Sequence, residues 1–246
     1  MSDTTAPPAD GPASETATSR PRWRRITGSF WFQLLLAFAV VGLVLTFIAK
    51  PYAVPSASMT DTLQVGDRVL VNRLAYVGAE PGTGDVIVFD AGDAWDTAPA
   101  EEEPLPKAIA RWAGEVTGFG PSGRHTLVKR VIGLPGQSVE CCTATGQITV
   151  DGEPLDEPYV SRDHEFIPGT LDCDSAQIST RCFAAVTVPD DRYLVLGDNR
   201  ANSSDSAAQC RGGIDDDGCW RWAERSEIVG KVSVILWPVS RWSLVD

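Results

Sequence analysis

An uncharged apolar segment near the N-terminus constrains the architecture of this chain more than any other feature. Residues 29–49 contain no acidic or basic side chain, and Phe, Leu, Val, Ile and Ala dominate the segment. A helix of about 20 apolar residues matches the hydrocarbon core of a bilayer, which is about 30 Å thick. We therefore expect one transmembrane helix over residues 29–49, with Trp23, Trp31 and Tyr52 near its ends as interfacial anchors.

Two other interpretations of this segment are less well supported. A cleaved signal peptide would be followed by small residues, whereas Lys50, Pro51 and Tyr52 follow here. A helix buried in a soluble protein would normally carry a polar face, and only Gln33 and Thr46 interrupt the apolar run.

The charges in front of the segment predict its orientation. Arg20, Arg22, Arg24 and Arg25 lie on the N-terminal side, which the positive-inside rule assigns to the cytoplasm. Residues 1–28 are then a cytoplasmic tail, which we expect to be disordered because Ser, Thr, Pro, Ala and Asp prevail ahead of the arginines. Residues 50–246 should form an extracytoplasmic domain.

Composition limits what that domain does. The chain has 246 residues and a formal net charge of -12, which argues against nucleic acid as a partner because phosphate binding requires a basic face. A hydrophobic content of 43% is enough for a packed core.

All six cysteines follow the apolar segment, which is consistent with an oxidising compartment. Zinc sites usually show Cys-x2-Cys or His-x3-His spacing, and neither is present, so we expect disulfides and no metal site. We predict the pairs Cys173–Cys182 and Cys210–Cys219, because each closes a short polar loop. Cys141 and Cys142 are adjacent, and the sequence leaves their partners open.

The chain beyond the apolar segment has short β-type runs separated by Gly and Pro, and no long amphipathic helix. This pattern predicts a mainly β fold. We expect an insertion at residues 91–124, which are acidic and rich in Pro, Gly and Ala, and a loop-rich cap within about residues 137–190. The expected strands are residues 66–72, 84–89, 126–132, 148–152, 192–196 and 231–237.

One lysine is placed unusually for its type. Lys129 lies inside an apolar strand and shares a face with Leu127 and Val131, so it should be buried. Burial lowers a lysine pKa from about 10.4 to about 7–8, the range of a general base. The alternative is a lysine that faces water or pairs with a carboxylate such as Asp198.

A serine pair offers a nucleophile for such a base. Pro51 and Pro55 keep the chain extended up to Ser56 and Ser58. Two residues apart in a strand, both hydroxyls would face one side, so Ser58 could attack while Ser56 stabilises an oxyanion. The alternative is a polar linker beside the membrane.

A third polar cluster covers residues 197–206 and follows an apolar strand. Its short hydroxyls and carboxylates suit the fixing of a lysine amine, although an Asx-rich turn would look similar. A histidine base has less support. His125 begins a strand without a nearby acid and serine pattern, and His164 lies in a charged loop.

These clusters, in this order behind one apolar helix, resemble bacterial type I signal peptidases. The resemblance covers most of the chain beyond the apolar segment. The motifs that carry it are Pro55-Ser56-Ala57-Ser58-Met59, residues 84–89, Lys129 with residues 130–136, and Gly197-Asp198-Asn199-Arg200 continuing to Asp205-Ser206.

The resemblance implies a set of roles. Ser58 is the expected nucleophile and Lys129 the expected general base, while Ser56 and the backbone N–H of Ser58 form the oxyanion hole. The expected supporting residues are Ser203, Asp198 and Asp205, and the expected substrate-binding residues are Tyr52, Val54 and Val128. The implied fold is an antiparallel β-sheet catalytic core with an inserted smaller β/loop cap, behind the transmembrane helix.

The implied activity is a membrane-anchored serine endopeptidase that cleaves signal peptides from exported preproteins after small residues, of the Ala-x-Ala type, through an acyl-enzyme. No cofactor or metal is implied. The expected partners are signal peptides and the lipid bilayer, and we expect a monomer. The expected location is the cell membrane, single-pass, with a cytoplasmic N-terminus.

Two positions depart from the family pattern, and the loop at residues 209–220 departs from it by being long and carrying two cysteines. The family usually has proline at the position of Asp61, and this change is expected to loosen the turn after Ser58. An arginine commonly follows the Asp-Ser pair, whereas Ala207 follows Asp205-Ser206 here. The candidates to replace that arginine are Arg200 and Arg211.

Three other functions are alternatives for a chain with these features. A self-cleaving Ser-Lys repressor protease would carry a DNA-binding region instead of an apolar helix and an acidic charge. A penicillin-binding enzyme would show Ser-x-x-Lys, which is absent. A membrane-anchored, disulfide-stabilised binding module with an inactive site is the alternative from another class, and a cleavage assay would separate it.

Overall fold

The structure is a computed structural model that describes residues 29–92, 95, 126–214 and 216–245. The expected tail at residues 1–28, most of the insertion at residues 91–124, and His125 lie outside the described residues. The chain divides into two compact units, Met1–Val41 and Gly42–Asp246, which are described separately.

The helix α2, Phe30–Phe47, forms within the expected apolar segment and begins in the first unit. It ends earlier than predicted, because Ala49 already belongs to the strand β1. Most of its large apolar side chains are exposed, including Phe30, Leu35 and Leu43. In the described part of the chain, no helix has both the length and the apolar character that crossing a membrane would require.

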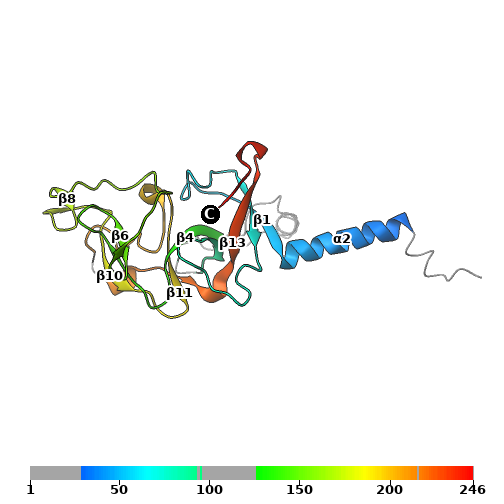
Figure 1. Cartoon of the computed structure of the whole chain (residues 1–246), viewed down its shortest axis with the longest axis horizontal. Coiled ribbons are helices and arrows are strands. Elements are labelled where there is room, and N and C mark those ends of the chain that lie inside the picture. The colour runs from blue at the N-terminus through cyan, green and yellow to red at the C-terminus, as the bar shows by residue number, and fades with distance from the viewer. Residues whose placement is uncertain (1–28, 93–94, 96–125, 215, 246) are drawn as a thin grey trace, which may run out of the picture. The chain divides into compact units, whose positions relative to one another are not determined.

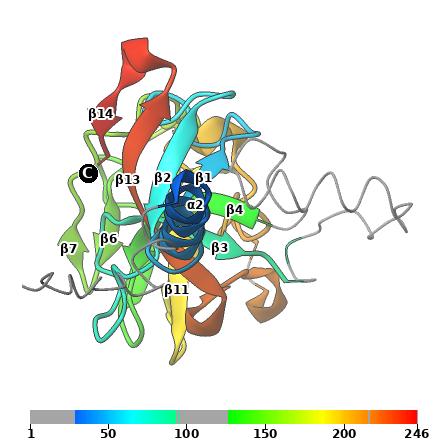
Figure 2. The same ribbon diagram turned by 90° about the vertical axis from the view of Figure 1, so that its right-hand side faces the viewer.

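The main sheet of the second unit has eight strands. Its order is β1-β2-β13-β3-β4-β11-β12, with β14 paired to β13, and every pairing is antiparallel. Figure 2 shows β14 folded back beside β13. The strands are β1 (Ala49–Ala53), β2 (Arg68–Asn72), β3 (Val86–Asp90), β4 (Thr126–Gly133), β11 (Arg192–Leu196), β12 (Ala223–Glu224), β13 (Ile228–Trp237) and β14 (Ser243–Leu244).

The two faces of the main sheet pack into different apolar clusters. In β3, Val86 and Val88 pack into one apolar cluster, while Ile87 and Phe89 pack into another. Successive residues of a strand point to opposite faces, so β3 is buried on both sides. The near-continuous apolar run predicted at residues 84–89 is therefore a strand covered on both faces.

The segment between β4 and β11 forms the cap. A four-stranded antiparallel sheet has the order β10-β5-β6-β7, and β8 pairs with β9 in parallel. In Figure 1, β6 and β10 lie on one side of β4 and β11, and β1 lies on the other. The strands are β5 (Ser138–Cys141), β6 (Ile148–Val150), β7 (Glu153–Pro154), β8 (Leu171–Asp172), β9 (Gln177–Ile178) and β10 (Phe183–Thr187).

A shared apolar cluster joins the cap to the main sheet. Val139, Ile148 and Phe183 of the cap pack with Ile132 and Leu194 of the main sheet. Each of these side chains is at most 2% exposed. Apolar packing therefore holds the cap on the main sheet, in addition to the polar contacts between them.

The remaining described elements are short. They are the 3-10 helices η2 (Arg200–Asn202), η3 (Asp217–Cys219), η4 (Arg225–Glu227) and η5 (Val239–Arg241). The two predicted disulfides are confirmed, since Cys173 pairs with Cys182 and Cys210 with Cys219. The pair that the sequence left open is Cys141–Cys142.

Candidate active site

The two candidate serines lie in the turn that follows β1, where the chain is no longer extended as predicted. Their hydroxyl oxygens are nevertheless 3.2 Å apart, and Ser58 is only 6% exposed. Met59 and Leu63 anchor the turn in the apolar cluster under β2 and β13. The two hydroxyls therefore lie close together, although a turn, and not the expected strand, brings them there.

A second loop holds the backbone of this turn. The backbone N–H of Asn199 donates to the carbonyl of Ser58 at 3.0 Å, and the Asn199 side-chain amide donates to the carbonyl of Ala57 at 3.0 Å. The loop at residues 197–200 directly follows β11, so the central sheet fixes the position of Ser58.

Lys129 lies in β4 opposite Ile87 and is 3% exposed, as predicted. Burial lowers the pKa of Lys129 to about 8, although Asp205 and Asp198 raise it. Within the described ranges, no hydrogen bond or ion pair occupies its amine. The register also pairs Leu196 with Arg130, so Gly197 follows at the level of Lys129.

Gly197 is the point where these parts approach most closely. A Cβ on Gly197 would lie 2.5 Å from the Ser58 carbonyl oxygen and would also overlap the Ser203 hydroxyl. The Ser203 hydroxyl is buried and has no hydrogen-bond partner in the described part of the chain. A buried hydroxyl of this kind is available to a polar neighbour such as a lysine amine.

Asp198 forms an ion pair with Arg130, a contact that no local motif of the sequence indicates. Arg130 donates to both carboxylate oxygens of Asp198, at 2.9 and 2.8 Å, and Thr62 donates at 2.5 Å. Arg130 also donates to the carbonyl of Gly84 at 2.7 Å. The alternative in which Lys129 pairs with Asp198 is therefore wrong, and Asp198 acts on that amine only through its field.

Asp205 has the arginine partner that Ala207 does not provide. Arg211 donates to the two carboxylate oxygens of Asp205 at 3.2 and 3.4 Å, and Gly197 N–H donates at 3.3 Å. Of the two candidates named from the sequence, Arg211 is correct. Arg200 instead pairs with Glu157.

The other departure, Asp61, does not simply loosen its turn. Asp61 has φ 84°, a backbone conformation that proline cannot adopt because its ring fixes φ near −65°. Its carboxylate accepts a hydrogen bond from Ser161 in the cap. The turn after Ser58 is thus tied to the cap.

The predicted substrate-binding residues lie together. Tyr52, Val54 and Val128 belong to one apolar cluster, with Val54 3% exposed and the other two partly buried. The strand β1 that leads to them is at one edge of the main sheet among the described strands. A separate pocket of about 350 Å³ lies in the cap and is lined by residues such as Leu155 and Arg181.

An antiparallel sheet that presents a buried serine, Ser58, hydrogen-bonded to the exposed Ser56, and a buried lysine of lowered pKa has the parts of a serine endopeptidase. The comparisons agree. The family model for signal peptidase, peptidase S26, matches residues 28–237. The chain is 37% identical to signal peptidase I of Mycobacterium tuberculosis, over 96% of this chain and 81% of the relative.

A second sequence relative is consistent with this match. The chain is 35% identical to a probable signal peptidase I of Mycobacterium leprae, over 93% of this chain and 84% of the relative. A solved signal peptidase I from Enterococcus faecalis V583 aligns with a TM-score of 0.32 at 23% identity, over 63% of this chain and 97% of that one.

The chain is therefore a serine endopeptidase. It belongs to the peptidase S26 family of signal peptidases, which cleave signal peptides from preproteins.

Proposed function

We propose that this chain is a membrane-anchored signal peptidase I that cleaves exported preproteins after small residues, using Ser58 as nucleophile and Lys129 as general base. The observation that carries the proposal is the burial of Lys129, which lowers its pKa to about 8 beside the loop that binds Ser58. A lysine amine is a base only when neutral, and this environment makes the neutral form accessible near physiological pH.

The chemistry follows from these positions. Neutral Lys129 takes the proton of the Ser58 hydroxyl as its oxygen attacks the scissile carbonyl. The oxyanion is stabilised by the Ser56 hydroxyl and the Ser58 N–H, and one such donor often contributes about 3–4 kcal/mol. Protonated Lys129 then gives its proton to the leaving amine. Water, deprotonated by Lys129, hydrolyses the resulting acyl-enzyme.

Three further residues support this arrangement. The unpartnered Ser203 hydroxyl is available to orient the Lys129 amine, and it lies against Gly197. Asp198 and Asp205 are buried carboxylates that hold the loop at residues 197–206 through Arg130 and Arg211. Asp198 and Asp205 therefore act through the position of the loop and the field at Lys129, and Ser203 acts through its hydroxyl.

Specificity for small residues of the Ala-x-Ala type is supported by the apolar cluster at the edge of the sheet. Tyr52, Val54 and Val128 leave only shallow apolar surface there, because Val54 is already packed into the core. An extended peptide that adds to β1 would bring alternate side chains to this surface.

Anchoring by residues 29–49 is supported by the exposed apolar side chains of α2, which water does not favour. The N-terminus would be cytoplasmic and residues 50–246 extracytoplasmic. Ser58 is eight residues beyond Lys50. At about 3.3–3.6 Å per residue it lies within about 29 Å of that end of the span, near the bilayer where signal peptides reside.

Alkaline extraction of membranes tests the anchor. The full chain should stay in the membrane pellet, and the double variant Leu36→Arg/Val40→Arg should be released because two charges in the span are costly. Leu74→Arg, at an exposed apolar position of the second unit, is the matched control. Release of the unaltered chain would contradict anchoring.

We further propose that the protein acts as a monomer, without a cofactor, a metal or nucleic acid.

Cleavage of a precursor with an Ala-x-Ala site tests the dyad. Ser58→Ala and Lys129→Met should each abolish cleavage while the protein remains folded and membrane-bound. Ser203→Ala should reduce cleavage less. The exposed Ser226→Ala is the control and should cleave as the unaltered chain does. Full cleavage by Lys129→Met would show that Lys129 is not the general base.

A further inference from the structure

A segment of the cap, residues 157–162, crosses both loops of the candidate active site. We call it the cap strap. Its Arg162 forms a parallel bridge with Asn199, and the carbonyl of Arg162 accepts a hydrogen bond from Ala201 N–H at 3.4 Å. Ser161 donates to Asp61 in the turn after Ser58. The cap strap therefore contacts the loop of the nucleophile and the loop that holds it.

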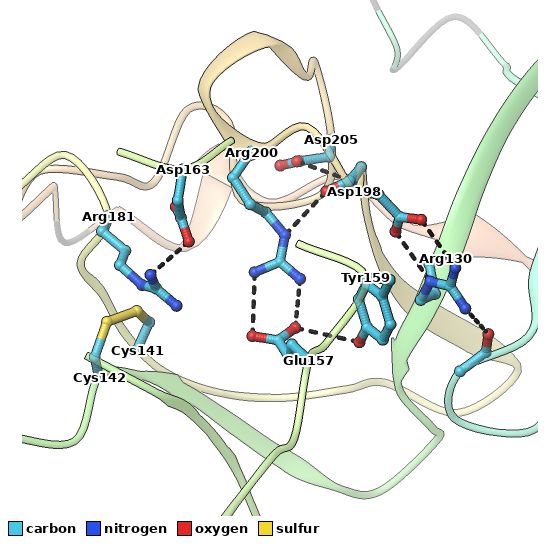
Figure 3. A network of polar contacts seen from close by, with 12 residues as sticks. Arg130, Cys141, Cys142, Glu157, Tyr159, Asp163, Arg181, Asp198, Arg200 and Asp205 are labelled. Carbon is cyan, nitrogen blue, oxygen red and sulfur yellow. Dashed lines mark hydrogen bonds and ion pairs between the residues drawn. A yellow bond between two sulfur atoms is a disulfide. The ribbon is translucent and has the colours of Figure 1, made fainter. Parts of the chain in front are cut away.

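The first buried link runs from Glu157 through Arg200 to Gly197. The Glu157 carboxylate faces the Arg200 guanidinium with both oxygens, and their side chains are 7% and 2% exposed (Figure 3). Nε of Arg200 donates to the carbonyl of Gly197 at 2.9 Å. Gly197 in turn lies against the carbonyl of Ser58, so this link ends at the nucleophile.

The second link runs from Tyr159 to Asp198. The Arg130 guanidinium lies over the Tyr159 ring, 3.9 Å from its centroid (Figure 3). That stacked Arg130 makes the paired hydrogen bonds to Asp198. The Tyr159 hydroxyl also donates to Glu157 at 3.3 Å, so the two links meet within the cap strap.

Resting on the function proposed above, we propose that Glu157 and Tyr159 are positioning residues for cleavage. Glu157 fixes Arg200, and Tyr159 fixes Arg130, so that the loop at residues 197–200 keeps Ser58 in line with Lys129. An attacking oxygen misplaced by about 1 Å costs about 100-fold in rate. The cap is thereby a part of the catalytic machinery and not only an addition to it.

A purely structural role for the cap strap makes a different prediction. The cap already packs on the main sheet through the cluster of Val139, Ile148 and Phe183 with Ile132 and Leu194. Loss of one polar side chain should leave that packing in place. A positioning role then appears as a fall in kcat at unchanged KM, measured on folded enzyme.

The test measures kcat and KM for a precursor-derived peptide, with kcat expressed per active site that acylates. Glu157→Gln should lower kcat about 100-fold and change KM by less than about twofold, since it disturbs placement and not substrate contact. Glu157→Asp, which keeps the charge, should recover part of the loss. Glu153→Gln, an exposed glutamate in β7 of the same cap, is the control and should match the unaltered chain.

A second pair of variants avoids leaving Arg200 buried without a counter-charge. Tyr159→Phe keeps the ring under Arg130 and should retain most of kcat, whereas Tyr159→Leu removes the ring and should lower kcat. If Glu157→Gln does not fold, the difference in kcat between Tyr159→Leu and Tyr159→Phe still tests the positioning role.

The outcomes separate the two proposals. If the unaltered chain cleaves no better than Ser58→Ala, the proposed function fails. If the unaltered chain cleaves, but Glu157→Gln matches Glu153→Gln or Tyr159→Leu matches Tyr159→Phe, the positioning role is overturned. A rise in KM at constant kcat would overturn it too, because the cap strap would then bind substrate.

Discussion

At the scale of single residues, two adjacent cations of β4 have opposite environments. Arg130 is paired with Asp198, whereas Lys129 has only the more distant fields of Asp198 and Asp205 to offset its burial. Desolvation exceeds those fields, so the pKa of Lys129 falls. One strand therefore carries a permanent charge and a titratable base side by side.

The first prediction concerns pH. Because the active base is the neutral amine, kcat/KM should rise with pH with a midpoint near the pKa of about 8 and level off above it. Steady-state kinetics between pH 6 and 10, in about half-unit steps, measures this. A profile that is flat through this range would contradict Lys129 as the base.

The same shift affects stability. The folded pKa is about 8 and the unfolded value 10.5, so between these values the unfolded chain binds more protons and stability rises with pH. Below pH 8 the burial of the protonated amine lowers the free energy of unfolding by about 3 kcal/mol. Lys129→Met should therefore be more stable than the unaltered chain at pH 7, and the difference should shrink towards pH 10. Denaturant melts at both pH values measure it.

Gly197 gives a third prediction at this scale. Gly197→Ala should abolish cleavage, since the added Cβ would lie 2.5 Å from the Ser58 carbonyl and backbone cannot rotate away. Adding Ser203→Gly should not restore activity, because it removes only the side-chain overlap. Gly82→Ala is the control, as its Cβ would meet Asp85 at 3.9 Å, an ordinary contact. Activity in Gly197→Ala would show that the two loops are not in contact.

At the scale of elements, the loop between Ala207 and η3 supplies the arginine that pairs with Asp205. Arg211 directly follows Cys210, whose disulfide to Cys219 closes the loop over the buried carboxylate of Asp205. The Arg211 guanidinium also lies near the Phe183 ring of the cap. The disulfide therefore holds a charge partner of the site in addition to stabilising the fold.

Removal of that partner gives a prediction at the scale of elements. Arg211→Ala should lower the free energy of unfolding by about 3 kcal/mol, because it leaves the Asp205 carboxylate buried and unpaired. The unopposed carboxylate should also raise the pKa of Lys129, so the midpoint of kcat/KM should move to higher pH. Arg211→Lys should shift it less. A midpoint that stays in place or falls would contradict this linkage.

The disulfide itself can be tested separately. Cys210→Ser/Cys219→Ser should reduce stability by about 2–4 kcal/mol and should shift the kinetic midpoint in the same direction as Arg211→Ala. Cys173→Ser/Cys182→Ser, which opens a loop of the same length in the cap, should reduce stability without that shift. Equal shifts of the kinetic midpoint in both double variants would argue against a specific role of the Cys210–Cys219 disulfide at the site.

The strands that the sequence predicted are those with a clear local pattern. Apolar alternation or a continuous apolar run predicted β2, β3, β4, β6, β11 and β13, and the structure confirms them. The strand β1 was missed because residues 49–53 continue from the apolar segment and contain Pro51. The strand β10 was missed because a register shift between Phe183 and Val186 breaks its alternation.

At the scale of the whole molecule, the site is assembled from segments far apart in the sequence. The sequence could indicate Ser58, Lys129 and the loop at residues 197–206, because each carries a local motif. It could not indicate that Glu157 pairs with Arg200 or that Tyr159 stacks on Arg130, since those contacts depend on how the cap folds back. Tertiary packing, and no local pattern, decides them.

The double-sided burial of β3 has a consequence for how the enzyme opens. Its residues Val86–Phe89 are at most 1% exposed and lie between β13 and β4, the strand that carries Lys129. Backbone amides in such a place exchange with deuterated solvent only when the whole domain unfolds. Hydrogen exchange there should give the global unfolding free energy, and faster exchange would reveal that the strand carrying the base detaches on its own.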